Sequence, residues 1–121
     1  MRTLPDKISS VEIGGQQILR DEAGYLIDPD DWTQEVAERL AEEESVDLSE
    51  DHWAVLRFMR EFLETHGVAA DARFVFQHLG ERHSETSKAA RRRFFLLFPY
   101  GYTKQACKVA GMRQPRAWST G

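Results

Sequence analysis

The sequence predicts a mainly helical α+β domain, in which a small N-terminal β-hairpin packs on a bundle of about five helices and a C-terminal arm follows. Helical apolar spacing and helix end signals recur along most of the 121-residue chain, whereas a strand-like pattern with a glycine turn occurs only near the N-terminus. Hydrophobic residues make up 41% of the chain, which is enough for one modest core. We therefore expect a single domain over residues 1–121, with a flexible N-terminus at 1–8 and the arm at 112–121.

The hairpin is expected near the start of the chain. Apolar and polar residues alternate over 11–13, Gly14-Gly15 favours a tight two-residue turn, and residues 16–19 supply the second strand. A further turn signal follows, and residues 25–27 are suited to a short third strand.

Five helices are expected after residues 28–31, where one proline and three aspartates end regular structure. The second helix has the clearest boundaries, because Ser49 is a suitable N-cap and Gly67 a natural C-terminal stop. Its apolar residues cover more than one face, which is typical of a central, largely buried helix. The expected helices span residues 32–44, 50–66, 71–80, 88–98 and 104–110, the last capped by Thr103 and closed by Gly111.

Charge is divided unevenly along the chain. Residues 1–70 carry 6 Lys/Arg and 17 Asp/Glu, whereas residues 71–121 carry 10 Lys/Arg and 3 Asp/Glu. The N-terminal part is therefore strongly acidic and the C-terminal part basic. Such a division indicates two faces that meet different partners or pair with each other.

Cys107 is the only cysteine, so any thiol chemistry depends on it and no internal disulfide can form. Lys104 and Lys108 are close to it in sequence, and neighbouring cations lower the pKa of a thiol. We therefore regard Cys107 as a possible sulfur acceptor whose thiolate is held by the two lysines. The alternative is a small buried side chain, because free cysteine is among the most buried residue types.

A basic cluster at residues 91–93 lies beside two phenylalanines. Together with basic residues of the arm and one tryptophan, it could contact an acidic protein or a nucleic acid. The alternative is a solvated helix face whose arginines pair with the acidic half. The link to the preceding helix, residues 81–86, is longer than in a tight helix-turn-helix. The candidate partner-binding residues are Arg91, Arg92, Arg93, Arg113, Arg116 and Trp118.

Several classes of function find no support in the sequence. The four histidines are not spaced as metal ligands, so we expect no metal and no cofactor. No apolar stretch approaches the roughly 18 residues of a membrane span, and the N-terminus has no secretory pattern. With the lone cysteine, these features favour a soluble protein of the reducing cytoplasm.

Three sequence blocks resemble the DsrC/TusE family, which includes the gamma subunit of dissimilatory sulfite reductase and a relay protein of tRNA 2-thiolation. The third block, LFPYG at 97–101 followed by KQACK at 104–108, is the most specific. The resemblance covers about residues 10–118. The other two blocks are residues 21–26 with 31–32 and residues 48–53 with 57–62, and the third continues to residue 111 and Pro115.

The resemblance implies a small helical protein with a mobile arm whose penultimate cysteine carries sulfur as a persulfide. It also implies sulfur-relay proteins or a sulfite reductase-type complex as partners, and it matches a second family cysteine to Cys107. Here the arm-cysteine position holds Trp118 or, with a small gap, Ser119, neither of which can form a persulfide. Tyr102 stands where a proline is usual, and residues 89–91 replace a Gly-Asn-Ser stretch.

Two functions therefore remain open. The chain is either a diverged relay component that handles sulfur through Cys107 or a non-catalytic, regulatory paralogue that binds relay or sulfite-reductase partners. Nucleic-acid binding through the basic helix at 88–98 is a third hypothesis.

Overall fold

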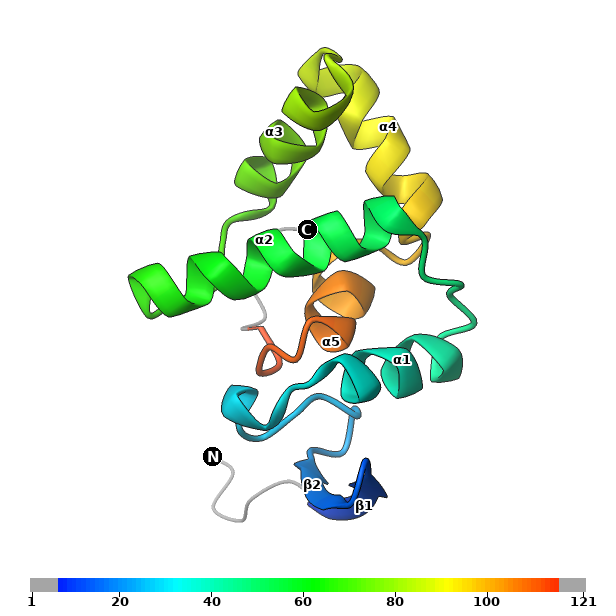
Figure 1. Ribbon diagram of the computed structural model, residues 1–121, viewed down its shortest axis with the longest axis vertical. Helices are drawn as coiled ribbons and strands as arrows, with labels where there is room; N and C mark the ends of the chain where they lie inside the picture. The colour runs from blue at the N-terminus through cyan, green and yellow to red at the C-terminus, as the bar shows by residue number, and fades with distance from the viewer. Residues whose placement is uncertain (1–6, 116–121) are drawn as a thin grey trace.

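The computed structural model describes residues 7–115, so Arg116, Trp118 and most of the expected flexible N-terminus lie outside the described residues. A two-stranded hairpin lies at one end of the molecule, the helices follow above it, and α3 and α4 form a V at the other end (Figure 1). The elements are β1 (Ser9–Ile13), β2 (Gln16–Arg20), η1 (Pro29–Asp31), α1 (Gln34–Glu43), α2 (Glu50–His66), α3 (Ala72–His83), α4 (Ser87–Leu97), η2 (Tyr102–Ala106) and α5 (Cys107–Val109).

The hairpin is confirmed, and its turn is where the sequence predicts it. β1 and β2 are antiparallel, with Ile13 opposite Gln16, and both turn glycines have positive φ angles of 60° and 84°. Such angles suit a type I′ turn and favour glycine. Ile13 and Ile18 are the buried residues of the two strands and belong to the hydrophobic core. The sheet is thus attached to the helices through one apolar face.

The third strand is reduced to a single bridge between Arg20 and Leu26. The carboxylate of Asp21 explains this difference, because it accepts hydrogen bonds from the backbone amides of Ala23 and Tyr25, each at 2.9 Å. These bonds fold residues 21–25 into a turn instead of an extended strand.

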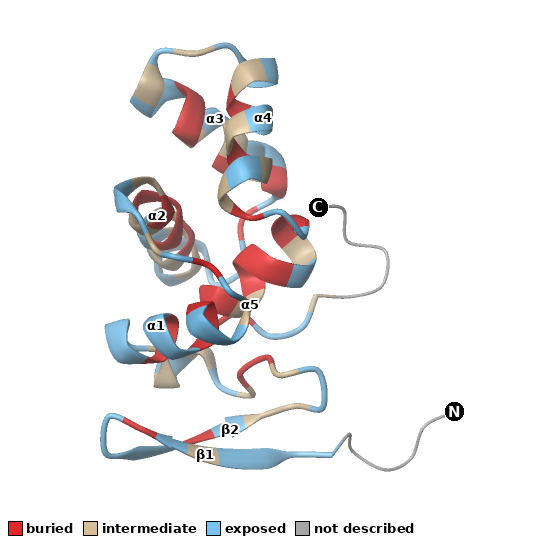
Figure 2. Ribbon diagram, turned by 90° about the vertical axis from the view of Figure 1, so that its right-hand side faces the viewer, coloured by how far each residue is buried: buried red, intermediate tan, exposed pale blue. Residues whose placement is uncertain are grey.

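The predicted boundaries of α2 are confirmed. Ser49 caps its first turn, and Gly67 ends it in the left-handed conformation with φ 74°. The helix runs across the middle of the molecule, between α1 and the pair formed by α3 and α4 (Figure 2), and His52, Ala54, Val55, Leu56 and Met59 are its buried residues. It is therefore the central helix that its apolar pattern predicts.

The start of the first helix was predicted two residues too early. α1 begins at Gln34, because the Thr33 hydroxyl caps it by accepting from the amide of Val36 at 3.2 Å. Trp32 lies outside the helix, and its indole Nε1 donates to the carbonyl of Val109 at 2.9 Å. Trp32, which the sequence periodicity placed in the helix, is thus held instead by a tertiary contact with α5.

The predicted end of the third helix at Gly80 is wrong, since α3 continues to His83 and only Ser84–Thr86 separates it from α4. A Cβ added to Gly80 would lie 3.3 Å from the Ala90 Cβ and 3.2 Å from the Glu85 carbonyl oxygen. The glycine therefore allows α4 to approach closely and does not act as a helix stop. Because only three residues separate α3 from α4, the length of this link no longer argues against a helix-turn-helix geometry.

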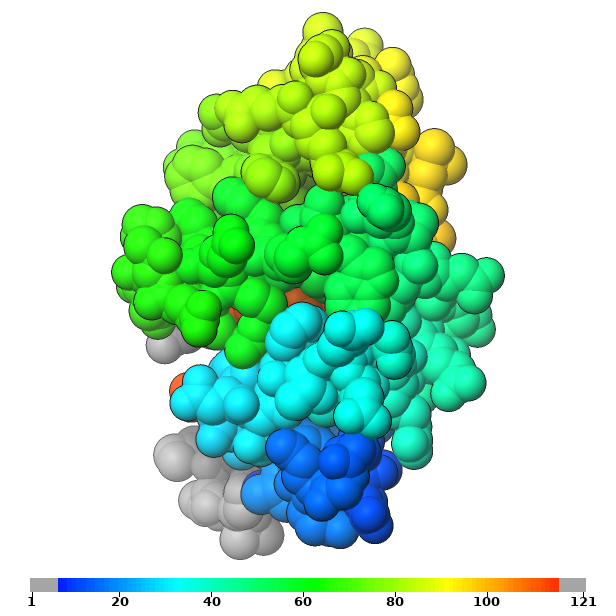
Figure 3. All heavy atoms as spheres, in the orientation of Figure 1, coloured from blue at the N-terminus to red at the C-terminus, as the bar shows by residue number. Residues whose placement is uncertain are grey.

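The last helix is not a regular helix capped by Thr103. It begins as the π-helical turn η2, in which the amide of Cys107 donates to the carbonyl of Tyr102, and continues into the three-residue α5. The Thr103 hydroxyl caps nothing and has no hydrogen-bond partner among the described residues. Figure 3 shows little of this segment between α1 and α2, which cover it on that face.

His52 forms an unusual capping box at the start of α2. Its Nδ1 accepts from the Ser49 amide at 3.0 Å, which leaves Nε2 to donate to the carbonyl of Leu97 at 2.8 Å. The ring also packs edge-on against Phe98. Burial lowers the pKa of His52 below its usual 6.5, with the Leu97 hydrogen bond acting in the opposite direction. The geometry thus requires the neutral ring.

We predict that His52 makes the protein less stable at acidic pH and that the variant His52→Gln lacks this contribution to the pH dependence. Because the folded-state pKa lies below the unfolded-state value, the stability that His52 provides is present above about pH 6.5 and is lost as the pH falls through the folded-state pKa. Glutamine keeps the capping geometry but does not titrate. Urea unfolding at pH 7.5 and 5.0 should show a larger loss of unfolding free energy in the wild type. Equal losses would contradict the prediction.

Candidate functional site

Cys107 is the first residue of α5 and lies inside the hydrophobic core. Only 1% of its surface is exposed. Tyr102, Gln105 and Ala106 of the preceding turn η2 are also buried, and the amide of Met112 donates to the carbonyl of Cys107 at 3.0 Å. Cys107 therefore occupies the position of a small buried side chain, which is the second of the two alternatives that the sequence left open.

The surroundings of Cys107 favour the protonated thiol. Burial raises the pKa of the thiol to about 12, and a hydrogen bond with Tyr102 acts in the opposite direction. The Tyr102 hydroxyl, however, donates its single proton to the carbonyl of Ala70, so it has none to give to a thiolate. Because the thiolate is the nucleophile of sulfur chemistry, Cys107 is poorly prepared to attack in this conformation.

The two lysines that flank Cys107 in sequence do not hold its sulfur. Lys108 Nζ lies 3.2 Å from Glu44 Oε2 and 5.2 Å from the centre of the Tyr25 ring. Lys104 is exposed, and neither lysine is among the causes that shift the pKa of Cys107. The expected thiolate site of Cys107, Lys104 and Lys108 is therefore not assembled.

Cys107 nevertheless lines a groove of about 680 Å³. One wall comes from the η1 turn, another from the end of α2 with Leu63 and Gly67, and a third from residues 112–115. Cys107 is therefore part of the wall of this groove, although only 1% of its surface is exposed. Arg113 lines the same groove and donates to the carbonyl of Ile27 at 3.2 Å.

Arg60 is the residue of this site that sequence reasoning missed. Its guanidinium donates to the carbonyls of Ala110 at 3.0 Å and Pro29 at 2.8 Å, and it stacks over Trp32 at 4.8 Å. It therefore joins α2 to the η1 turn, which forms one wall of the groove, and to the residue that follows α5. The available signal was an arginine within the apolar part of α2, where burial requires polar partners.

The structure describes four of the six candidate partner-binding residues, and it does not bring these four together. Arg93 is neutralised by a two-point contact with Glu85, at 2.9 Å for each bond, and its guanidinium lies 3.9 Å from Asp51. Arg91 and Arg92 are exposed on α4, while Arg113 belongs to the groove of Cys107. Arg93 is thus paired mainly with Glu85 of its own basic part of the chain, and among the three arginines only Arg93 forms an ion pair with the acidic part, through Asp51.

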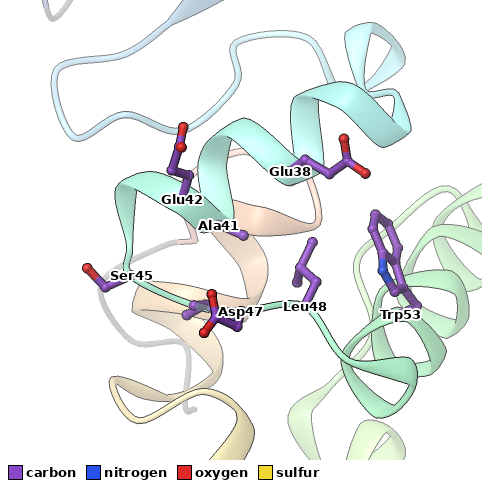
Figure 4. Close-up of a pocket in the computed structure, with 8 residues that line it drawn as sticks. Glu38, Ala41, Glu42, Ser45, Asp47, Leu48 and Trp53 are labelled. Carbon is purple, nitrogen blue, oxygen red and sulfur yellow. The ribbon is translucent and has the colours of Figure 1, made fainter.

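A second groove of about 590 Å³ lies between α1 and the start of α2 (Figure 4). Glu38, Glu42 and Asp47 surround it, and Leu48 and Trp53 supply apolar surface. It contains no nucleophilic or metal-binding set. Within residues 7–115 no three His, Cys, Asp or Glu side chains are grouped to hold a metal ion, and no helix there is long and apolar enough to cross a membrane.

We predict that Arg60→Met loosens the groove and exposes Cys107. The substitution leaves the carbonyl of Ala110 without its Arg60 donor, at a cost of about 1–3 kcal/mol, and leaves the carbonyl of Pro29 with only the Trp32 amide. Alkylation of the native protein with iodoacetamide, followed by mass spectrometry, should be faster than in the wild type. Arg57→Met, which changes an exposed arginine of the same helix, is the matched control. Equal rates in the two variants would show that Arg60 does not close the groove.

Comparison with known proteins agrees with this architecture. A family described as "DsrC like protein" matches residues 12–117. Sulfurtransferase TusE of Photorhabdus laumondii is 38% identical over 101 residues, which cover 84% of this chain and 90% of the relative. TusE of Yersinia pseudotuberculosis is 36% identical over 105 residues, covering 87% and 96%.

Solved structures give the same result. The oxidised DsrC gamma-subunit of the dissimilatory sulfite reductase from Archaeoglobus fulgidus has a TM-score of 0.77 and 31% identity, covering 90% of this chain and 98% of its own. DsrC of Allochromatium vinosum has a TM-score of 0.78 and 33% identity, covering 92% and 98%. The hairpin, the helices and the block around Cys107 therefore identify this chain as a member of the DsrC-like family of sulfur-trafficking proteins.

Proposed function

We propose that this chain serves sulfur relay as a binding or regulatory partner and not as a carrier of persulfide. Relatives named sulfurtransferase TusE support sulfur relay as the setting. The proposed partners are other relay proteins or a sulfite reductase-type complex, since one structural relative is a gamma-subunit of such an enzyme. The proposed location is the cytoplasm, where a single thiol stays reduced.

The observation that carries the proposal is the burial of the only cysteine. Transfer of sulfur between proteins requires a thiolate of one to reach a sulfur of the other. Cys107 is 1% exposed, and its pKa is raised to about 12. The arm position at which the resemblance predicts a second cysteine holds Trp118 or Ser119. Binding to relay partners requires neither Cys107 nor a cysteine in the arm.

A second candidate function is sulfur transfer through Cys107 itself. It is favoured by one observation, namely that Cys107 lines a groove whose walls include residues 112–115. Displacement of this segment by a partner would uncover the sulfur. The two candidates differ in whether the native chain gains sulfur from a donor.

We predict that the native chain does not gain sulfur. The test is intact-mass spectrometry after incubation with polysulfide or a persulfidated sulfurtransferase, with Cys107→Ser as control. A carrier would gain about 32 Da, the mass of one sulfur, in the wild type only. We expect no gain in the folded protein and a gain after unfolding in urea, because unfolding exposes Cys107. Loading of the folded wild type at a rate comparable to the unfolded chain would establish the carrier function instead.

A further inference from the structure

One face of α4 exposes an apolar centre surrounded by positive charge. Phe95 and Leu96 form the centre, Lys88, Arg91 and Arg92 surround it, and together they line a shallow concavity of about 600 Å³. Leu96, in the last turn of α4, is 82% exposed. We call these five residues the α4 surface. Figure 1 shows that α4 lies at the end of the molecule opposite the hairpin.

The folded core does not account for this surface. The buried residues Ala90 and Phe94 attach α4 to the rest of the molecule, and they occupy a different side of the helix from Leu96. A leucine on the solvent side contributes nothing to the core, and an exposed apolar centre with a polar rim is typical of an interaction site. The α4 surface therefore has the composition of an interface and not of a solvated helix face.

The charges of the α4 surface are also unpaired within the described chain. Lys88, Arg91 and Arg92 form no ion pair with a carboxylate in residues 7–115, whereas the adjacent Arg93 is held by Glu85. The Arg91 guanidinium lies over the rings of Phe76 and Phe95, at 5.6 Å and 5.7 Å. This stacking fixes a positive charge at the edge of the apolar centre. Three cations thus remain available to an external ligand.

We propose that the α4 surface docks an acidic amphipathic helix of a partner protein. An aliphatic side chain of that helix would cover Phe95 and Leu96, and carboxylates on either side would pair with Lys88, Arg91 and Arg92. A nucleic acid fits less well, because phosphates would satisfy the cations but leave Leu96 exposed to water. The surface is separate from Cys107, so this inference holds whether or not Cys107 carries sulfur.

The test uses three fluorescein-labelled 15-residue amphipathic peptides with the same leucine face and an acidic, neutral or basic polar face. Fluorescence anisotropy should show that the acidic peptide binds the full chain at least about tenfold more tightly than the other two, and that its binding weakens with added salt. A 20-base-pair DNA duplex serves as the competing ligand. Absence of any preference for the acidic peptide would overturn the proposal.

Variants locate the binding. Leu96→Asp and the double change Arg91→Glu with Arg92→Glu should each weaken binding of the acidic peptide by about tenfold or more. The control is Arg73→Glu, an exposed arginine on α3, which should bind within about twofold of the wild type. Circular dichroism melting verifies that each variant is folded, as expected for surface positions. Equal binding by Leu96→Asp and Arg73→Glu, or tighter binding of the DNA than of the peptide, would refute the docking of an acidic helix here.

Discussion

The structure depends on how the segment from Tyr102 to Met112 is held in the centre of the molecule. This segment is short and partly π-helical, so its own hydrogen bonds are not sufficient to fix it. Side chains from distant parts of the chain supply the remaining donors. Tyr25 binds the carbonyl of Thr103, Trp32 that of Val109 and Arg60 that of Ala110. The turn after the hairpin, the residue two positions before α1, and α2 are thus each joined to this one segment.

The same contacts explain the state of Cys107. A segment held from several sides by tyrosine, tryptophan and arginine excludes water, and exclusion of water disfavours a charged sulfur. Structural attachment and thiol reactivity therefore compete at this position. In this chain the structural role prevails over reactivity, since the sulfur is buried and the neighbouring Lys108 is bound to Glu44. Sequence proximity of lysine and cysteine did not reveal this, because a helix directs the two side chains to different neighbours.

The sequence predicts those parts of the fold that depend on local chemistry. The glycine pair of the hairpin and the Ser49 and Gly67 ends of α2 act through their own backbone conformation, and both were correctly predicted. The end of α3 was not, because Gly80 serves a contact with Ala90 that is formed only in the folded chain.

The candidate site shows the same limit of sequence reasoning. The family could be identified from the block around Cys107, but the burial of the sulfur and the role of Arg60 depend on residues far apart in sequence. Among the three consecutive arginines, only folding shows that Arg93 is neutralised by Glu85 while Arg91 and Arg92 are exposed.

The π-helical turn has a consequence for how this protein could evolve. A π turn contains one more residue than an α-helical turn, and successive residues of an α-helix are about 100° apart around its axis. Loss of a single codon within residues 102–106 would convert η2 to an α-helical turn and rotate α5 by about that angle. The sulfur of Cys107 would then turn away from its present neighbours, and the lining of the groove would change with it. One residue of the π turn thus sets which part of the protein the thiol faces.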